Sequence, residues 1–115
     1  MSLDVYLYID IDTGGPEPYR SELFDYNITH NLGPMASEAG LYNAMWRPDE
    51  HDYTEAGQLI EPLRAGLQAL LDDPPRYIAL EPDNRWGTYG GLVTFAAKYL
   101  SACRMHPKAN VTVSR

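Results

Sequence analysis

The chain has 115 residues, a formal net charge of −7 and a single cysteine. A chain of this length hides roughly 65% of its unfolded surface on folding, so it can form one domain with a core and without a disulfide. Its acidic balance opposes binding to duplex nucleic acid, and it has neither an apolar run of bilayer length nor a signal-peptide pattern. We therefore expect residues 1–115 to be a single soluble domain of the cytoplasm that binds neither duplex nucleic acid nor membranes.

The charge is unevenly distributed along the chain. Up to Gly57, eleven acidic residues face two basic ones, which gives −9, whereas after it five acidic residues face seven basic ones, which gives +2. This asymmetry serves solubility, and it also leaves open an acidic interaction surface in the first half. That surface would be formed by six carboxylates: Asp4, Asp10, Asp12, Glu17, Glu22 and Asp25.

Alternating patterns predict strands at both ends of the chain. Apolar residues from Leu3 to Ile11 alternate with polar ones and tyrosines, which is typical of a half-buried strand. The segment 13–18 is rich in Gly and Pro and breaks this strand, and the extended run 23–28 is expected to return antiparallel to it. Residues 110–114 alternate again and predict a terminal strand.

Helical patterns fill the middle of the chain. We expect Thr29 to cap a helix that reaches Ala39, with a start or a kink at Pro34, and a short helical piece over 41–46. Thr54 is expected to cap a second helix over 55–71, which Pro62 should bend. After the prolines at 74 and 75, we expect the segment to Arg85 to be irregular, or briefly extended at 77–80. A last helix over 87–105 carries Cys103 in its apolar stripe, which indicates a buried thiol.

These elements predict an α+β domain in the order β-β-α-α-α-β. A small antiparallel sheet, made of an N-terminal hairpin plus the C-terminal strand, would pack against about three helices on one face. The two ends of the chain should meet in this sheet.

The segment 26–32 is the first candidate site, because it places polar side chains between apolar ones where a strand passes into a helix. Its candidate ligand-binding residues are Asn27, Thr29, His30 and Asn31. A helix N-terminus beside them would attract an anion and disfavour an imidazolium, which leaves His30 as a neutral donor or base. The same residues could equally be capping and core groups, since buried polar groups must be paired.

Two further stretches place an aromatic ring next to a guanidinium at a helix end. The first contains Trp46 and Arg47, and the second contains Arg85, Trp86, Thr88 and Tyr89. Such sets can stack on a planar ring and clamp a phosphate, although the tryptophans could instead fill the core. Since all three clusters fall at helix termini, we ask of the structure whether they converge on one pocket.

The three histidines lie far apart in the sequence, and the single cysteine offers no ligand pair. We therefore expect no metal site and no cofactor. Oligomeric state is open, although exposed strand edges make a homo-oligomer a reasonable expectation.

Several motifs together resemble a family of small uncharacterised proteins from bacteriophage and bacterial genomes. The similarity lies in the segments Met1–Leu7, Asn27–Leu32, Gly40–Tyr42, Trp46–Pro48, Ala56–Ile60, Trp86–Tyr89 and Val111–Arg115. It implies a phage accessory setting, and hence the host cytoplasm, without implying an activity.

Three function classes follow from the sequence. The first is a protein that binds a small nucleotide-like anion without turnover. In a phage setting, such a protein would be a sponge that sequesters a nucleotide-derived defence signal of the host. The second is a small hydrolase or transferase with His30 as general base, for which the chain offers no clear nucleophile. The third is an acidic interaction or inhibitor module. We lean against an enzyme.

Overall fold

The computed structural model, which describes residues 1–115, is a small α+β domain with an antiparallel sheet, as the sequence predicts. The strands are β1 (Ser2–Ile11), β2 (Tyr19–Thr29) and β3 (Asn110–Ser114). The α-helices are α1 (Gly33–Glu38), α2 (Tyr42–Trp46), α3 (Ala56–Asp72), α4 (Pro74–Ile78) and α5 (Tyr89–Met105), and two 3-10 segments are η1 (His30–Leu32) and η2 (Pro48–His51).

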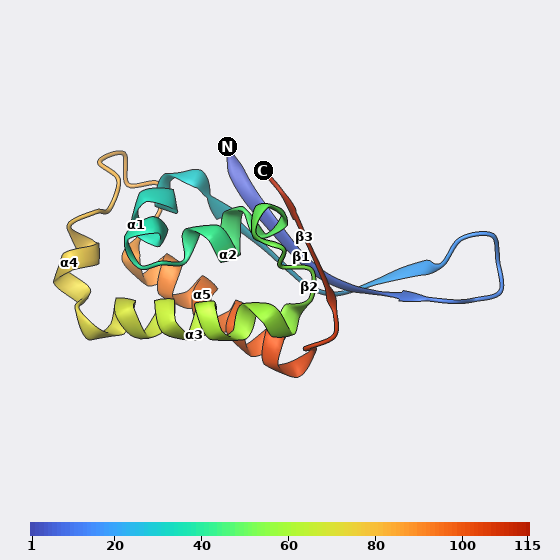
Figure 1. The fold of residues 1–115 in the computed structure, drawn as a ribbon. Coiled ribbons are helices and arrows are strands. Elements are labelled where there is room, and N and C mark those ends of the chain that lie inside the picture. The colour runs from blue at the N-terminus through green and yellow to red at the C-terminus, as the bar shows by residue number, and fades with distance from the viewer.

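The sheet joins the two ends of the sequence. Its strand order is β2-β1-β3, so that Val5 in the central strand is opposite Tyr26 on one side and Val113 on the other. The alternation read from the sequence holds, because Leu3, Val5 and Leu7 are buried while the residues between them are only partly covered. The first and last residues consequently lie close together (Figure 1).

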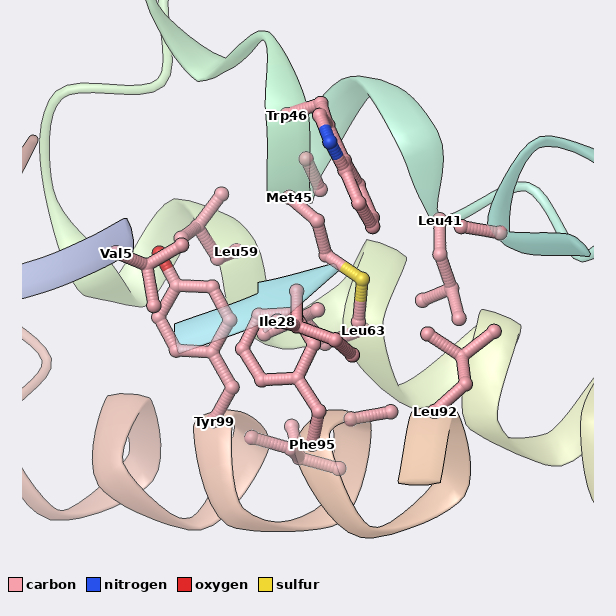
Figure 2. Packing of buried hydrophobic residues seen from close by; sticks show 14 of the residues in the cluster. Val5, Ile28, Leu41, Met45, Trp46, Leu59, Leu63, Leu92, Phe95 and Tyr99 are labelled. Carbon is pink, nitrogen blue, oxygen red and sulfur yellow. The ribbon is translucent and has the colours of Figure 1, made fainter. Parts of the chain in front are cut away.

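Helices α3 and α5 cover the buried face of the sheet. Aromatic rings from β2 and α5 stack in this layer, with centroid distances of 4.9 Å for Tyr26–Phe95 and 5.6 Å for Phe24–Tyr99. Met45 from α2 enters the same core from above (Figure 2). Cys103 is buried, as its place in the apolar stripe predicted.

Two segments differ from the sequence prediction. β2 begins at Tyr19 rather than at Leu23, because β1 continues to pair with it as far as Ile11. The segment expected to be irregular or extended contains α4, since two prolines occupy the first turn of that helix, where proline is tolerated. Tyr77 then anchors α4 in the core with only 3% of its surface exposed.

The helix starts agree with the sequence at one cap and differ at another. Thr29 caps η1, because its Oγ1 accepts a hydrogen bond from the Asn31 N–H at 3.2 Å. α3 is capped by Glu55 instead of Thr54, through a capping box in which Gln58 accepts from the Glu55 N–H at 2.9 Å. Pro62 lies within α3 and does not end it.

Beyond the helices, β1 and β2 continue as a two-stranded ribbon. β3 pairs only with residues 4–8 of β1, so that residues 9–22 form a hairpin that projects from the domain (Figure 1). We call this segment the arm. It explains why the molecule measures 53 × 27 × 22 Å although its core is small.

Candidate functional site

A cavity of about 560 Å³ opens on the surface beside the chain ends. α1 and α2 supply most of its wall, η1 contributes His30, and the ends of β1 and β3 close it. The lining residues are Met1, His30, Gly33, Pro34, Ser37, Tyr42, Trp46, Arg47 and Arg115. Three of the ten residues predicted from the sequence, His30, Trp46 and Arg47, therefore do converge.

The imidazole of His30 is held in one orientation by Trp46. The Trp46 indole N–H donates to Nδ1 of His30 at 2.9 Å. Because Nδ1 acts as the acceptor, the neutral ring carries its proton on Nε2. Nε2 makes no hydrogen bond within the chain, so His30 offers an N–H donor to the cavity it lines.

Trp46 forms the floor of the cavity. It is 2% exposed, and it stacks with Tyr42 at a centroid distance of 5.6 Å and an interplanar angle of 11°. A ring that is covered to this degree can offer a ligand only a small part of its edge. The sequence suggested that Trp46 stacks on a ligand. In the structure, the partner that stacks on Trp46 is Tyr42 of the same chain.

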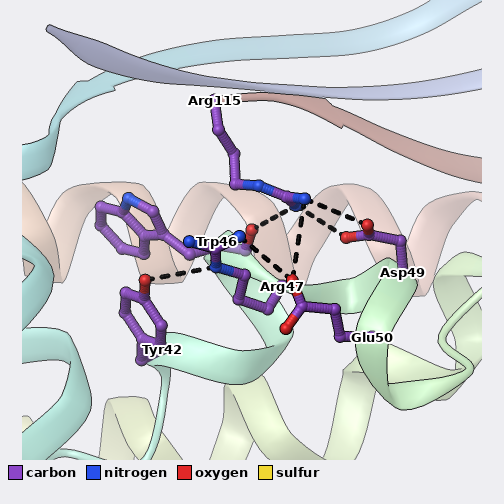
Figure 3. A network of polar contacts seen from close by, with 6 residues as sticks. All are labelled: Tyr42, Trp46, Arg47, Asp49, Glu50 and Arg115. Carbon is purple, nitrogen blue, oxygen red and sulfur yellow. Dashed lines mark hydrogen bonds and ion pairs between the residues drawn. The ribbon is translucent and has the colours of Figure 1, made fainter.

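Two guanidinium groups stand at the cavity and are tied to carboxylates of η2 (Figure 3). Nη1 of Arg115 donates to Oδ1 of Asp49 at 2.7 Å, and Nη2 donates to Oδ2 at 3.1 Å. Arg47 donates through Nη1 to Glu50 at 3.1 Å. The formal charges of these four side chains balance one another.

These contacts shift the titration of the groups. The hydrogen bond from Arg115 holds the pKa of Asp49 below its ordinary value, and the same bond raises the pKa of Arg115. The hydrogen bond between Arg47 Nε and the Tyr42 hydroxyl, at 3.4 Å, is the main reason that the pKa of Arg47 is raised. These shifts keep Arg47, Asp49 and Arg115 charged near neutral pH.

Both guanidinium groups keep unused donors. A guanidinium has five N–H groups. Arg47 uses two, on Tyr42 and Glu50, which leaves three. Arg115 uses one Nη1 bond on the Trp46 carbonyl and two bonds on Asp49, and its Nη2 also forms an ion pair with Oε2 of Glu50 at 3.8 Å, so that its Nε–H is the donor outside these contacts. Together with the Nε2–H of His30, these donors can receive an anion without breaking the carboxylate pairs.

The other predicted residues lie elsewhere. Asn27 and Thr29 border a smaller hollow of about 340 Å³ with Thr88 and Gly87. Their polar groups are used structurally: the Asn27 amide donates to Asp4 at 2.8 Å, Thr29 caps η1, and Thr88 caps α5. These three residues do not line the cavity that contains His30.

Asn31 connects the two regions. Its amide donates to the Trp86 carbonyl at 3.2 Å and so fixes the loop before α5 to η1. The Trp86 side chain is 71% exposed, whereas Tyr89 donates its hydroxyl to the Leu70 carbonyl. Arg85 has a left-handed backbone with φ of 62° and lines neither hollow.

Sequence reasoning missed six of the nine lining residues: Met1, Gly33, Pro34, Ser37, Tyr42 and Arg115. Tyr42 had a signal, because it lies four residues before Trp46 in a short helix and so shares its face. Arg115 had only an indirect signal: if the end strands pair, the last residue lies near the helices that follow the first hairpin. No pattern in the sequence specified that Arg115 would contact those helices.

No group of three or more His, Cys, Asp or Glu side chains is placed to hold a metal ion. No helix combines the length and the apolarity that a bilayer crossing requires.

Fold and site together define a small α+β domain with an open, aromatic-floored cavity and a guanidinium rim. No protein-family model, curated protein or solved structure matches the chain.

Proposed function

We propose that the chain binds a small anionic ligand in the His30–Arg47–Arg115 cavity and releases it unchanged. The observation that carries this proposal is the set of donors without partners, on two guanidinium groups and one imidazole, around a hollow of about 560 Å³. That volume falls within the range of pockets for small molecules. Arg is well suited to phosphate and carboxylate groups, which it meets with two parallel N–H bonds.

A nucleotide-like ligand fits the division of the cavity into two parts. Its phosphate would take the free N–H groups of Arg47 and Arg115, while its base or sugar would lie against Pro34 and the accessible surface of Tyr42. In a phage-encoded protein of the host cytoplasm, this activity would amount to a sponge for a nucleotide-derived defence signal. The family resemblance motivates that setting, and the cavity supports only the class of ligand.

Binding without turnover is favoured over catalysis by the state of His30. A general base needs a free lone pair that faces its substrate, and the lone pair on Nδ1 is taken by the Trp46 indole. The nitrogen without a partner carries a proton. His30 is therefore arranged as a donor, and a hydrolase or transferase would need this hydrogen bond to break.

The acidic interaction module remains a second candidate, since four of its six carboxylates share one face. Asp4, Asp10, Glu22 and Asp25 occupy register positions on the side of the sheet away from the helices, where Asp25 is opposite Tyr6 and Asp10 is opposite Arg20. The pKa of Tyr6 is raised chiefly by Asp4, which is consistent with a negative potential over this face. A basic protein partner would fit it.

The first experiment is mass spectrometry of small molecules released when the natively purified protein is denatured, before and after incubation with a nucleotide-rich cell extract. An unchanged bound anion supports the proposal. Conversion of a metabolite to a product would support the enzyme instead. If the protein neither retains nor converts a small molecule, the binding proposal and the enzyme are both contradicted. The interaction module is then the candidate that is left.

Titration calorimetry then tests the site itself. With adenosine monophosphate, adenosine and inorganic phosphate as probes, we expect a response to the two probes that carry phosphate. Arg47→Gln and Arg115→Gln should each weaken binding by about tenfold, the loss of a charge-assisted hydrogen bond. Arg85→Gln is the matched control and should bind like the wild type. Equal effects of all three substitutions would contradict the site.

A further inference from the structure

The arm has an apolar face that nothing in its own chain covers. The pairing of β1 with β3 ends at Tyr8. Beyond that residue β1 pairs only with β2 in a ribbon of two strands, with Ile9 opposite Ser21 and Ile11 opposite Tyr19. Such a ribbon is marginally stable in water unless it packs against something. Its length and regular pairing therefore point to a surface that supports it.

The two faces of the arm differ in character. Ile9, Ile11 and Tyr19 fall on the face that is continuous with buried Leu7, and they are 36%, 42% and 63% exposed. The opposite face and the turn carry charge. Between residues 9 and 22, four carboxylates face one Arg: Asp10, Asp12, Glu17 and Glu22 against Arg20. The arm is thus apolar on one side and acidic around it.

The C-terminal end of α5 has the complementary character. Met105 is 71% exposed, and Arg104 and Lys108 beside it are also exposed. This helix end lies at the same end of the molecule as the base of the arm (Figure 1). The nearby carboxylate of Glu55 is occupied, because it caps the first turn of α3. An exposed apolar residue is thus flanked by two free positive charges.

A second group of exposed apolar residues does not match an acidic arm. Leu71, Ile78 and Leu80 lie at the opposite end of the molecule, around α4, and next in sequence to the carboxylates of Asp72, Asp73 and Glu81. Like charges brought together across an interface oppose association. Charge therefore selects the end of α5 over the region of α4.

We propose that two copies of the chain form a reciprocal dimer, in which the arm of each copy lies over the α5 end of the other. The arm projects beyond its own helices, so that they do not cover its apolar face (Figure 1). Around a twofold axis the same contact forms twice, which is the commonest arrangement of soluble homo-oligomers. The dimer is independent of the ligand proposed for the cavity.

Sedimentation analysis of charge-reversed variants tests this pairing. The arm-reversed variant is Asp10→Lys with Glu17→Lys, and the helix-reversed variant is Arg104→Glu with Lys108→Glu. Each alone places like charges at both contacts and should weaken the dimer by about tenfold or more. An equal mixture of the two variants restores opposite charges at both contacts, so a heterodimer should form again with about wild-type strength.

Two controls make the result specific. Asp72→Lys with Asp83→Lys changes the net charge as the arm-reversed variant does, but at the opposite end, and should leave the dimer unaffected. Ile11→Ser with Tyr19→Ser keeps every charge and should weaken the dimer, while thermal melts show that the fold persists. A wild type that stays monomeric up to submillimolar concentration, or a mixture no better than its components, overturns the proposal.

Discussion

The indole N–H of Trp46 donates to Nδ1 of His30 at 2.9 Å, and this bond decides which nitrogen of the imidazole faces the cavity. It joins α2 to the segment that follows β2. Because Nδ1 is occupied, His30 can donate a hydrogen bond to a ligand but has no free lone pair with which to remove a proton from it.

The tautomer of His30 can be read by nitrogen NMR. We expect the neutral ring to carry its proton on Nε2, because Trp46 occupies Nδ1. Trp46→Phe keeps an aromatic ring but removes the donor, so both tautomers should then be populated. A wild-type ring protonated on Nδ1 would contradict the arrangement and reopen the role of general base.

The pair between Asp49 and Arg115 makes a prediction about pH. The hydrogen bond from Arg115 lowers the pKa of Asp49 in the folded protein. The pair therefore contributes to folding stability above the pKa that Asp49 has in the unfolded chain, and this contribution is lost as pH falls through the pKa of the folded state. Carbon NMR of the carboxyl group should give a midpoint below that of a free Asp. In Arg115→Gln the midpoint should rise toward the ordinary value. An unchanged midpoint would mean that the pair does not form in solution.

Cys103 should be chemically silent in the folded protein. Burial raises the pKa of its thiol to about 12, and only the thiolate reacts with disulfide reagents. At mildly alkaline pH we expect slow labelling that becomes immediate in denaturant. Because the folded pKa is raised, this group contributes stability below its unfolded pKa and loses it as pH rises above that value. Fast labelling of the native protein would show that the α5 stripe is open.

The hydroxyl of Tyr99 is buried in the core without a hydrogen-bond partner. A buried polar group in this state costs about 1–3 kcal/mol. Tyr99→Phe keeps the ring stacked between Phe24 and Phe95 and removes only the hydroxyl. We therefore expect denaturant unfolding to show a gain of about 1 kcal/mol in stability. A loss would show that a buried water satisfies this hydroxyl.

Periodicity predicted the parts of the fold that depend on one face being buried. The alternation around Val5 and Val113 gave both end strands, and the stripes of α3 and α5 gave the two covering helices. Pro74 and Pro75 begin α4, although the sequence predicts an irregular or extended segment after them. Local preference does not show whether a proline ends one helix or begins the next.

The site was harder to predict, because residue type does not show what a side chain already contacts. Trp46 and Trp86 had the same signal, an aromatic ring beside an Arg, yet one is 2% exposed and the other 71%. Their difference comes from tertiary packing. Trp46 stacks on Tyr42, whereas Trp86 lies on a loop whose backbone is held by Asn31. The contact of Trp46 follows the four-residue spacing of a helix, whereas the contact of the Trp86 loop joins residues 55 positions apart and follows no spacing in the sequence.

The pairing of β1 with β3 has a consequence for the order of events in folding. The contact between Val5 and Val113 closes nearly the whole chain into a loop, and contacts of such separation form late and slowly. Met1 and Arg115, which this pairing brings together, both border the cavity. An intermediate with its helices docked but its last strand loose would therefore lack the site. A ligand of this cavity would bind only the finished fold, and by mass action it would hold the last strand in place.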